Sequence, residues 1–177
     1  MNNHFELFGL APAYALEAEA LDRAYLEIQA RVHPDRHANG GDAARRAAMQ
    51  WTTRVNEAYR TLKSPLERAK YLLELNGVDV AFETNTAMPQ DFLVRQMELR
   101  EALEEASARR DAAALDRLHT MLRTERHEIE GELAERIDGS RDYAGASGLV
   151  RKLKFLVRLD EEIDATFDAI ESDGVKS

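Results

Sequence analysis

The chain has 177 residues, of which 44% are apolar and 32% are charged, so it can bury one large core or two small ones. It contains no cysteine, which excludes disulfides, zinc-thiolate sites and cysteine-ligated iron–sulfur clusters. No apolar run approaches the roughly 20 residues of a membrane span, and the N-terminal residues lack the character of a presequence. We therefore expect a cytoplasmic protein without a membrane segment.

The net charge of −9 is confined to one part of the chain. Residues 1–76 carry equal numbers of acidic and basic side chains, so residues 77–177 hold the whole excess of acid. A nucleic-acid binder needs clustered positive charge to neutralise phosphates, and the acidic half argues against that function. The uneven charge also indicates two domains with different partners.

Apolar periodicity predicts an all-α protein whose first 76 residues hold four helices. These are expected over about 5–10, 17–32, 43–62 and 65–75. Asp42 is expected to cap the third helix, and Trp51 to lie in its buried stripe. Ser64 is expected to cap the fourth helix, with Pro65 at its first position and Glu67 completing a capping box.

Residues 77–88 keep no helical period, and we interpret them as a linker. Val78, Val80 and Phe82 alternate as in a strand, but no partner strand follows, so they are expected to dock on a neighbouring segment. Three amphipathic helices follow, over about 89–110, 111–137 and 142–170. Their short connections predict an antiparallel three-helix bundle over 89–172, with a frayed tail at 173–177.

The most informative motif is the tripeptide His33-Pro34-Asp35, between the second and third helices. Pro34 disfavours a helical conformation at His33, so the tripeptide is expected at the top of a helical hairpin. His33 and His37 have the spacing of some metal-binding pairs, but Pro34 breaks the helix that would place them on one face. The sequence also lacks a nucleophile elbow and a phosphate-binding glycine loop, so neither a metal site nor enzyme activity is expected.

The helix over 89–110 has two apolar faces. At about 100° per residue, Phe92 and Leu99 share the face expected in the bundle core. Leu93, Val94 and Met97 point away from that face, among acidic neighbours. A small apolar patch with a polar rim is typical of a partner site, although a neighbouring helix could instead cover it.

Phe155 is a second candidate contact, because it lies about 120° away from the core stripe of the last helix. Its neighbours in sequence are basic. The alternative is that Phe155 packs under the N-terminal domain or the linker. His119 and His127 lie on a charged helix surface and are expected to be solvated.

Residues 4–76 resemble a J domain, the module by which DnaJ-type co-chaperones engage an ATP-dependent chaperone. The resemblance implies that the tripeptide contacts the chaperone's ATPase domain and linker and stimulates ATP hydrolysis, while nearby arginines face an acidic chaperone surface. The implied chaperone-binding residues are His33, Pro34, Asp35, Arg23, Arg31 and Arg36. Many J domains carry a basic pair where this chain has Leu26 and Glu27, so its cationic surface is thinner.

Nearly the whole chain resembles the HscB family, the J-type co-chaperones of bacterial iron–sulfur cluster assembly. The matching segments are 5–10, 33–35, 64–69, 92–93, 98–101 and 151–156. The resemblance implies an L-shaped protein with a J domain over 1–76, an HscA-type chaperone of the DnaK class as partner, and a bundle that binds the IscU scaffold. The implied scaffold-binding residues are Leu93, Val94, Met97, Glu98, Glu101, Glu105 and Phe155.

The resemblance implies no cofactor and no catalytic residue in this chain, and we expect a monomer. Two alternatives remain open. The chain could be a J-domain co-chaperone for a different client, with the acidic bundle as an adaptor. It could also be a structural dimer that associates through its charged helices.

Overall fold

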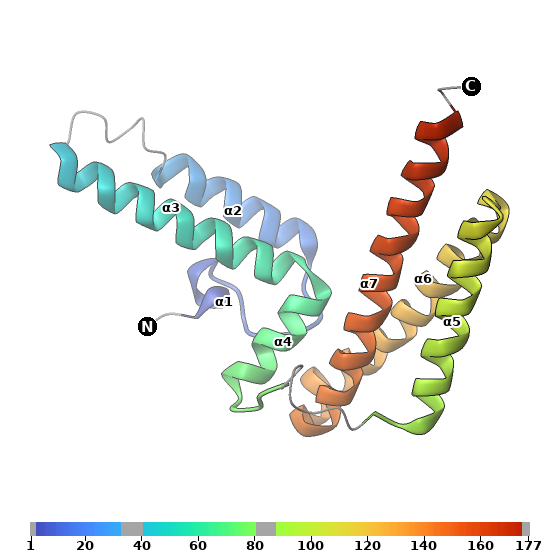
Figure 1. The fold of residues 1–177 in the computed structure, drawn as a ribbon. Coiled ribbons are helices and arrows are strands. Elements are labelled where there is room, and N and C mark those ends of the chain that lie inside the picture. The colour runs from blue at the N-terminus through green and yellow to red at the C-terminus, as the bar shows by residue number, and fades with distance from the viewer. Residues whose placement is uncertain (1–2, 33–40, 81–87, 175–177) are drawn as a thin grey trace. The chain divides into compact units, whose positions relative to one another are not determined.

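The computed structural model describes residues 3–32, 41–80 and 88–174, and all regular structure within these ranges is helical. The chain divides into two compact units, Met1–Gly77 and Val78–Ser177. Figure 1 shows the helices of each unit. In the same ranges no helix is both long and apolar enough to cross a membrane. The L shape that the resemblance implies stays a prediction.

The described residues of the first unit form four helices packed around one small core. They are α1 (His4–Leu7), α2 (Ala18–Val32), α3 (Gly41–Lys63) and α4 (Pro65–Leu75). Helices α2 and α3 lie side by side as an antiparallel hairpin (Figure 1), as the facing stripes predicted. Leu21 of α2 and Val55, Ala58 and Leu62 of α3 are fully buried, and Phe5 of α1 completes this core.

The predicted start of α3 is wrong in two details. The helix begins at Gly41, so Asp42 lies in its first turn and does not cap it. Gly41 has φ +76°, a left-handed conformation that glycine adopts readily, which lets the chain enter the helix two residues early. Trp51 is 38% exposed, and its ring lies 5.8 Å from the Arg54 guanidinium carbon at the surface rather than in the core.

The predicted ends of α4 are confirmed. The Ser64 hydroxyl accepts a hydrogen bond from the Glu67 backbone N–H at 3.3 Å, and Pro65 occupies the first helical position. The predicted capping box is wrong in its second half, because the backbone N–H of Ser64, which the Glu67 side chain was expected to accept from, donates to Arg60 O at 3.2 Å. Gly77 follows the helix with φ +76°.

The second unit is a bundle of three long helices, as predicted. They are α5 (Gln90–Ala108), α6 (Ala112–Ala134) and α7 (Tyr143–Gly174). A π-helical segment, η2 (Glu135–Ser140), continues α6 beyond its predicted end, and α7 runs four residues past the predicted Ile170. One hydrophobic core cluster of this unit contains the buried residues Leu99, Leu103, Ala106, Leu115, Leu118, Leu122, Leu156, Leu159 and Ile163.

The first residues of the predicted linker pack on the bundle. Val80 is 1% exposed, and its carbonyl accepts a hydrogen bond from Arg151 Nη1 of α7 at 3.3 Å. Val78 is half-buried, and Phe82 lies outside the described residues. Residues 78–80 therefore belong to the second unit, which agrees with the docking expected of this segment.

Candidate partner-binding sites

The tripeptide His33-Pro34-Asp35 and Arg36 lie outside the described residues. Their flanks are described: α2 reaches Val32, and α3 begins at Gly41. The motif therefore connects the two helices of the hairpin, as the sequence predicts, and its contacts with a chaperone stay a prediction.

Two of the arginines predicted to face the chaperone lie on the exposed side of α2. Arg23 and Arg31 form ion pairs one turn back along the helix, with Glu19 at 3.7 Å and Glu27 at 3.9 Å. The arginine side chains are 65% and 76% exposed. Exposed pairs of this kind contribute little to stability, so both guanidinium groups can turn towards an acidic partner at small cost. Leu26, 62% exposed, shares this helix.

A polar network holds α2 against α3. Lys63 Nζ donates to both oxygens of Asp22, at 2.6 and 2.8 Å, and the Tyr59 hydroxyl donates to Asp22 Oδ1 at 2.9 Å. The Lys63 hydrogen bond, followed by that of Tyr59, lowers the pKa of Asp22. The rings of Tyr25 and Tyr59 stack with centroids 4.0 Å apart. These contacts fix the pairing of the two helices that lead to the tripeptide.

The two-faced character predicted for α5 is confirmed. Phe92 and Leu99 are buried in the bundle, at 7% and 1% exposure. Leu93, Val94 and Met97 are 43%, 50% and 63% exposed, so no helix of the described chain covers them. The acidic residues predicted to share this surface, Glu98, Glu101 and Glu105, are also exposed. The structure thus brings six of the seven predicted scaffold-binding residues onto the outer side of one helix.

The predicted exposure of Phe155 is wrong. Its side chain is half-buried and packs against the core cluster of the bundle. The ring stands edge-on to Phe92 of α5, with centroids 5.7 Å apart, and the Arg100 guanidinium lies 5.6 Å from it. The displacement of Phe155 from the stripe of α7 turns it towards α5, because in a three-helix bundle each helix has two neighbours. Phe155 therefore lies at the α5–α7 seam, partly accessible beside the α5 surface.

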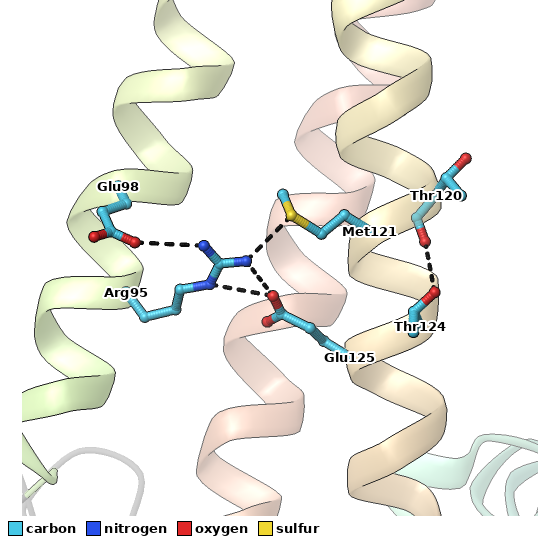
Figure 2. A network of polar contacts seen from close by, with 6 residues as sticks. All are labelled: Arg95, Glu98, Thr120, Met121, Thr124 and Glu125. Atoms are coloured by element: carbon cyan, nitrogen blue, oxygen red, sulfur yellow. Dashed lines mark hydrogen bonds and ion pairs between the residues drawn. The ribbon is translucent and has the colours of Figure 1, made fainter.

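The seam between α5 and α6 contains residues that sequence reasoning missed. Arg95 of α5 reaches Glu125 and Met121 of α6, and its Nη1 also lies 3.4 Å from Glu98 Oε2 (Figure 2). The pKa of Arg95 is raised, and the hydrogen bond to Glu125 is the largest cause of this shift. Met121 is 37% exposed. Opposite charges on two adjacent predicted helices could have indicated this contact. Periodicity does not predict the register between α5 and α6, so the pairing itself could not be predicted.

The prediction of a solvated His119 is also wrong. Its Nε2 lies 3.5 Å from Asp160 Oδ1 of α7, and the side chain is 31% exposed. Asp160, which interrupts the apolar stripe of α7, is 14% exposed and pairs with Arg126 of α6 at 2.6 Å. His119, Arg126 and Asp160 therefore join α6 to α7 and are part of the packing of the bundle. His127 is exposed, as predicted.

The described parts of the chain contain no group of three histidine or carboxylate side chains placed to hold a metal ion. What they do present is a helical hairpin with exposed arginines and, in a separate unit, an exposed apolar patch edged by acids. This arrangement is that of a helical binding protein, with one candidate surface in each unit.

Comparison with known proteins identifies the family. The model of the HSCB C-terminal oligomerisation domain matches residues 88–164. The chain is 46% identical to the co-chaperone protein HscB homolog of Azoarcus sp. strain BH72, covering 96% of both chains. The chaperone HscB from Vibrio cholerae is 36% identical with a TM-score of 0.83, covering 96% of this chain and 99% of that one. Human co-chaperone HscB is 25% identical with a TM-score of 0.88, covering 93% and 82%.

The chain therefore belongs to the HscB co-chaperone family. This membership confirms the predicted fold class, an N-terminal J domain followed by a C-terminal helical bundle. It also confirms that the protein acts as a co-chaperone rather than as an enzyme.

Proposed function

We propose that the J domain stimulates ATP hydrolysis by an HscA-type chaperone of the DnaK class, while the bundle delivers an IscU-type iron–sulfur scaffold to that chaperone. Membership of the HscB family supports the assignment of both partners. In this proposal the protein acts in the bacterial cytoplasm. It brings the scaffold to the chaperone, and no chemical reaction takes place on this chain.

One observation carries the assignment of the scaffold-binding site. Leu93, Val94 and Met97 form an exposed apolar patch on α5, although α5 buries another apolar face in the core. An apolar group of this size, placed among exposed carboxylates, has the anatomy of a protein interface. Glu98, Glu101 and Glu105 supply the charged rim, and Phe155 supplies an aromatic edge at the α5–α7 seam.

The proposal couples the two partners by binding both of them to one chain. In the proposal, His33, Pro34 and Asp35 contact the chaperone, and Arg23, Arg31 and Arg36 orient it during association. Holding both partners on one chain converts the second encounter into an intramolecular one, which raises the effective concentration of scaffold at the chaperone. The two sites lie in separate units, so each can be disabled alone.

The test is the ATPase rate of a purified HscA-type chaperone, measured with the chain alone, with an IscU-type scaffold alone, and with both. We expect stimulation by the chain and a further increase when the scaffold is added. A rate that does not respond to the chain contradicts the chaperone assignment. Stimulation by the chain without any effect of the scaffold favours the alternative, a J-domain co-chaperone for a different client.

The matched family model describes the bundle as an oligomerisation domain, which keeps self-association as a second candidate for the same helices. The monomer stays our prediction. Sedimentation velocity of the full chain at about micromolar concentration separates the two, since a single species near 20.0 kDa is expected and a dimer contradicts it.

A further inference from the structure

We propose that the scaffold-binding surface continues from α5 across the helix seam onto α6, where Met121 is a contact residue and Glu125 is a positioning residue. This inference rests on the function proposed above. It adds two residues of α6 to a surface otherwise formed by α5 and one residue of α7.

Arg95 lies in the seam and is shared between the two helices (Figure 2). Its Nε donates to Glu125 Oε1 at 3.1 Å, and its Nη2 contacts the same oxygen. The contact of Nη1 with Glu98 Oε2, at 3.4 Å, is longer and weaker. Glu125 is 26% exposed and Glu98 is 59% exposed, so water screens the pair with Glu98 more. The Arg95 charge is therefore committed mainly to Glu125.

The commitment of Arg95 to Glu125 leaves the Glu98 carboxylate available to a partner. Glu98 lies among other exposed carboxylates, Glu101 and Glu105, on a unit that carries the chain's excess of acid. Complementary charge favours a partner segment with lysine or arginine beside its apolar anchors. Without Glu125, Glu98 is the carboxylate that stays within reach of Arg95 among the described residues, and Arg95 would neutralise it before the partner arrives.

Met121 extends the apolar part of the surface in the same direction. It is 37% exposed, and its Sδ lies 3.2 Å from Arg95 Nη2. The aliphatic stem of Arg95 spans the seam, and Arg95 follows Val94, which is 50% exposed. Arginine stems cover apolar surface while the charged group stays paired, and a methionine thioether adapts to irregular partners. An apolar side chain resting on Val94 can therefore reach Met121 without crossing an unpaired charge.

The first arm of the test measures binding of the full chain to a purified IscU-type scaffold by calorimetry. We expect Met121→Ala to weaken binding about three- to tenfold, as for an apolar residue near the edge of an interface. Met121→Lys should weaken it further, since it places a cation opposite a cationic partner. The matched control is Met49→Ala, on α3 of the other unit, which is 58% exposed and should bind as the wild type does.

The second arm tests Glu125 as a positioning residue. Glu125→Gln should weaken binding about three- to tenfold, mainly through a slower association rate. Asp116→Asn is the matched control. It removes one charge from an exposed position on the opposite side of α6 from Glu125 and should change binding little. In the Glu98→Gln background, Glu125→Gln should have no further effect, because the carboxylate that Arg95 would neutralise is gone. A merely structural role of Glu125 would instead weaken binding equally in both backgrounds.

The outcomes separate the inference from the function on which it rests. Wild-type binding by Met121→Ala, Met121→Lys and Glu125→Gln, with binding lost in Leu93→Ala/Met97→Ala, overturns the extension onto α6 and leaves the proposed function standing. Unchanged binding of the Leu93→Ala/Met97→Ala variant overturns the assignment of the patch itself. Circular dichroism and melting curves for each variant establish that the fold is intact.

Discussion

The ring of Phe155 on α7 stands edge-on against the ring of Phe92 on α5, with centroids 5.7 Å apart and planes at 87°. Phe92 is 7% exposed, so the pair joins the surface at the α5–α7 seam to the interior of the bundle. Arg100 of α5 also lies 5.6 Å from the Phe155 ring. Phe155 thus contributes to the fold as well as to the proposed surface, whereas Leu93 and Met97 contribute to the surface.

Replacing Phe155 is expected to affect stability. Phe155→Ala removes a half-buried ring and its edge contact, and should lower the free energy of unfolding by about 2 kcal/mol. Leu93→Ala together with Met97→Ala should change it by less than about 1 kcal/mol, since both side chains are largely exposed. Urea unfolding followed by circular dichroism measures both. Equal destabilisation by the two variants would contradict the different roles assigned to these residues.

The ion pair between Arg126 and Asp160 is expected to stabilise the α6–α7 contact. Asp160 is 14% exposed, so Arg126→Met leaves its carboxylate partly buried without the cation at 2.6 Å. We expect a loss of about 2 kcal/mol in the free energy of unfolding at pH 7. The double variant Arg126→Met/Asp160→Leu removes both charges and should recover most of this loss. A double variant as unstable as the single one would show that packing, not the uncompensated charge, causes the effect.

His4 is expected to make the first unit less stable in mild acid. Its ring stacks on Tyr71 with centroids 4.3 Å apart, and burial lowers the pKa of His4 below its usual 6.5, with Glu57 opposing this shift and Arg54 adding to it. In the unfolded chain the His4 side chain takes up a proton near pH 6.5, whereas in the folded chain it stays neutral to a lower pH. The stability contribution is therefore complete above pH 6.5 and is lost as the pH falls through the folded pKa.

The matched variant is His4→Phe, which keeps a ring against Tyr71 and cannot titrate. Between pH 7.5 and pH 5.5 the wild type should lose more stability than His4→Phe in otherwise identical urea titrations. The same pH dependence in both proteins would rule out the assigned role of His4.

Arg23 and Arg31 are expected to affect the rate of association with the chaperone rather than the fold. Both are exposed and pair with glutamates one turn away, at 3.7 and 3.9 Å. Arg23→Ala/Arg31→Ala should slow association several-fold at low salt, and the difference should shrink as salt screens it. The melting temperature should change little. Arg117→Ala/Arg123→Ala, which removes two exposed cations from α6, is the matched control and should associate normally.

The features that periodicity could predict are those that depend on one helix at a time. The outward direction of Leu93, Val94 and Met97 follows from their angles relative to Phe92 and Leu99, and the structure confirms it. The cap of α4 is also local to its own residues, and it forms as expected.

At the candidate binding surface, the errors concern contacts between helices. Phe155 was expected to be exposed because it is off the stripe of α7, but α5 approaches that flank and half-buries it. The contact of Met121 and Glu125 with Arg95 depends on the register of α6 against α5, which a single helix pattern does not contain. Trp51 shows the opposite error, since it lies on the predicted stripe of α3 yet is 38% exposed.

The most direct test of the two-site account measures two quantities on the same three proteins: stimulation of an HscA-type chaperone's ATPase, and the dissociation constant for an IscU-type scaffold. We predict that His33→Gln loses ATPase stimulation and binds the scaffold as the wild type does. Leu93→Ala/Met97→Ala should bind the scaffold at least about thirtyfold more weakly, about 2 kcal/mol, yet retain stimulation measured without scaffold. If either variant loses both activities in equal measure while remaining folded, the assignment of one partner to each unit is contradicted.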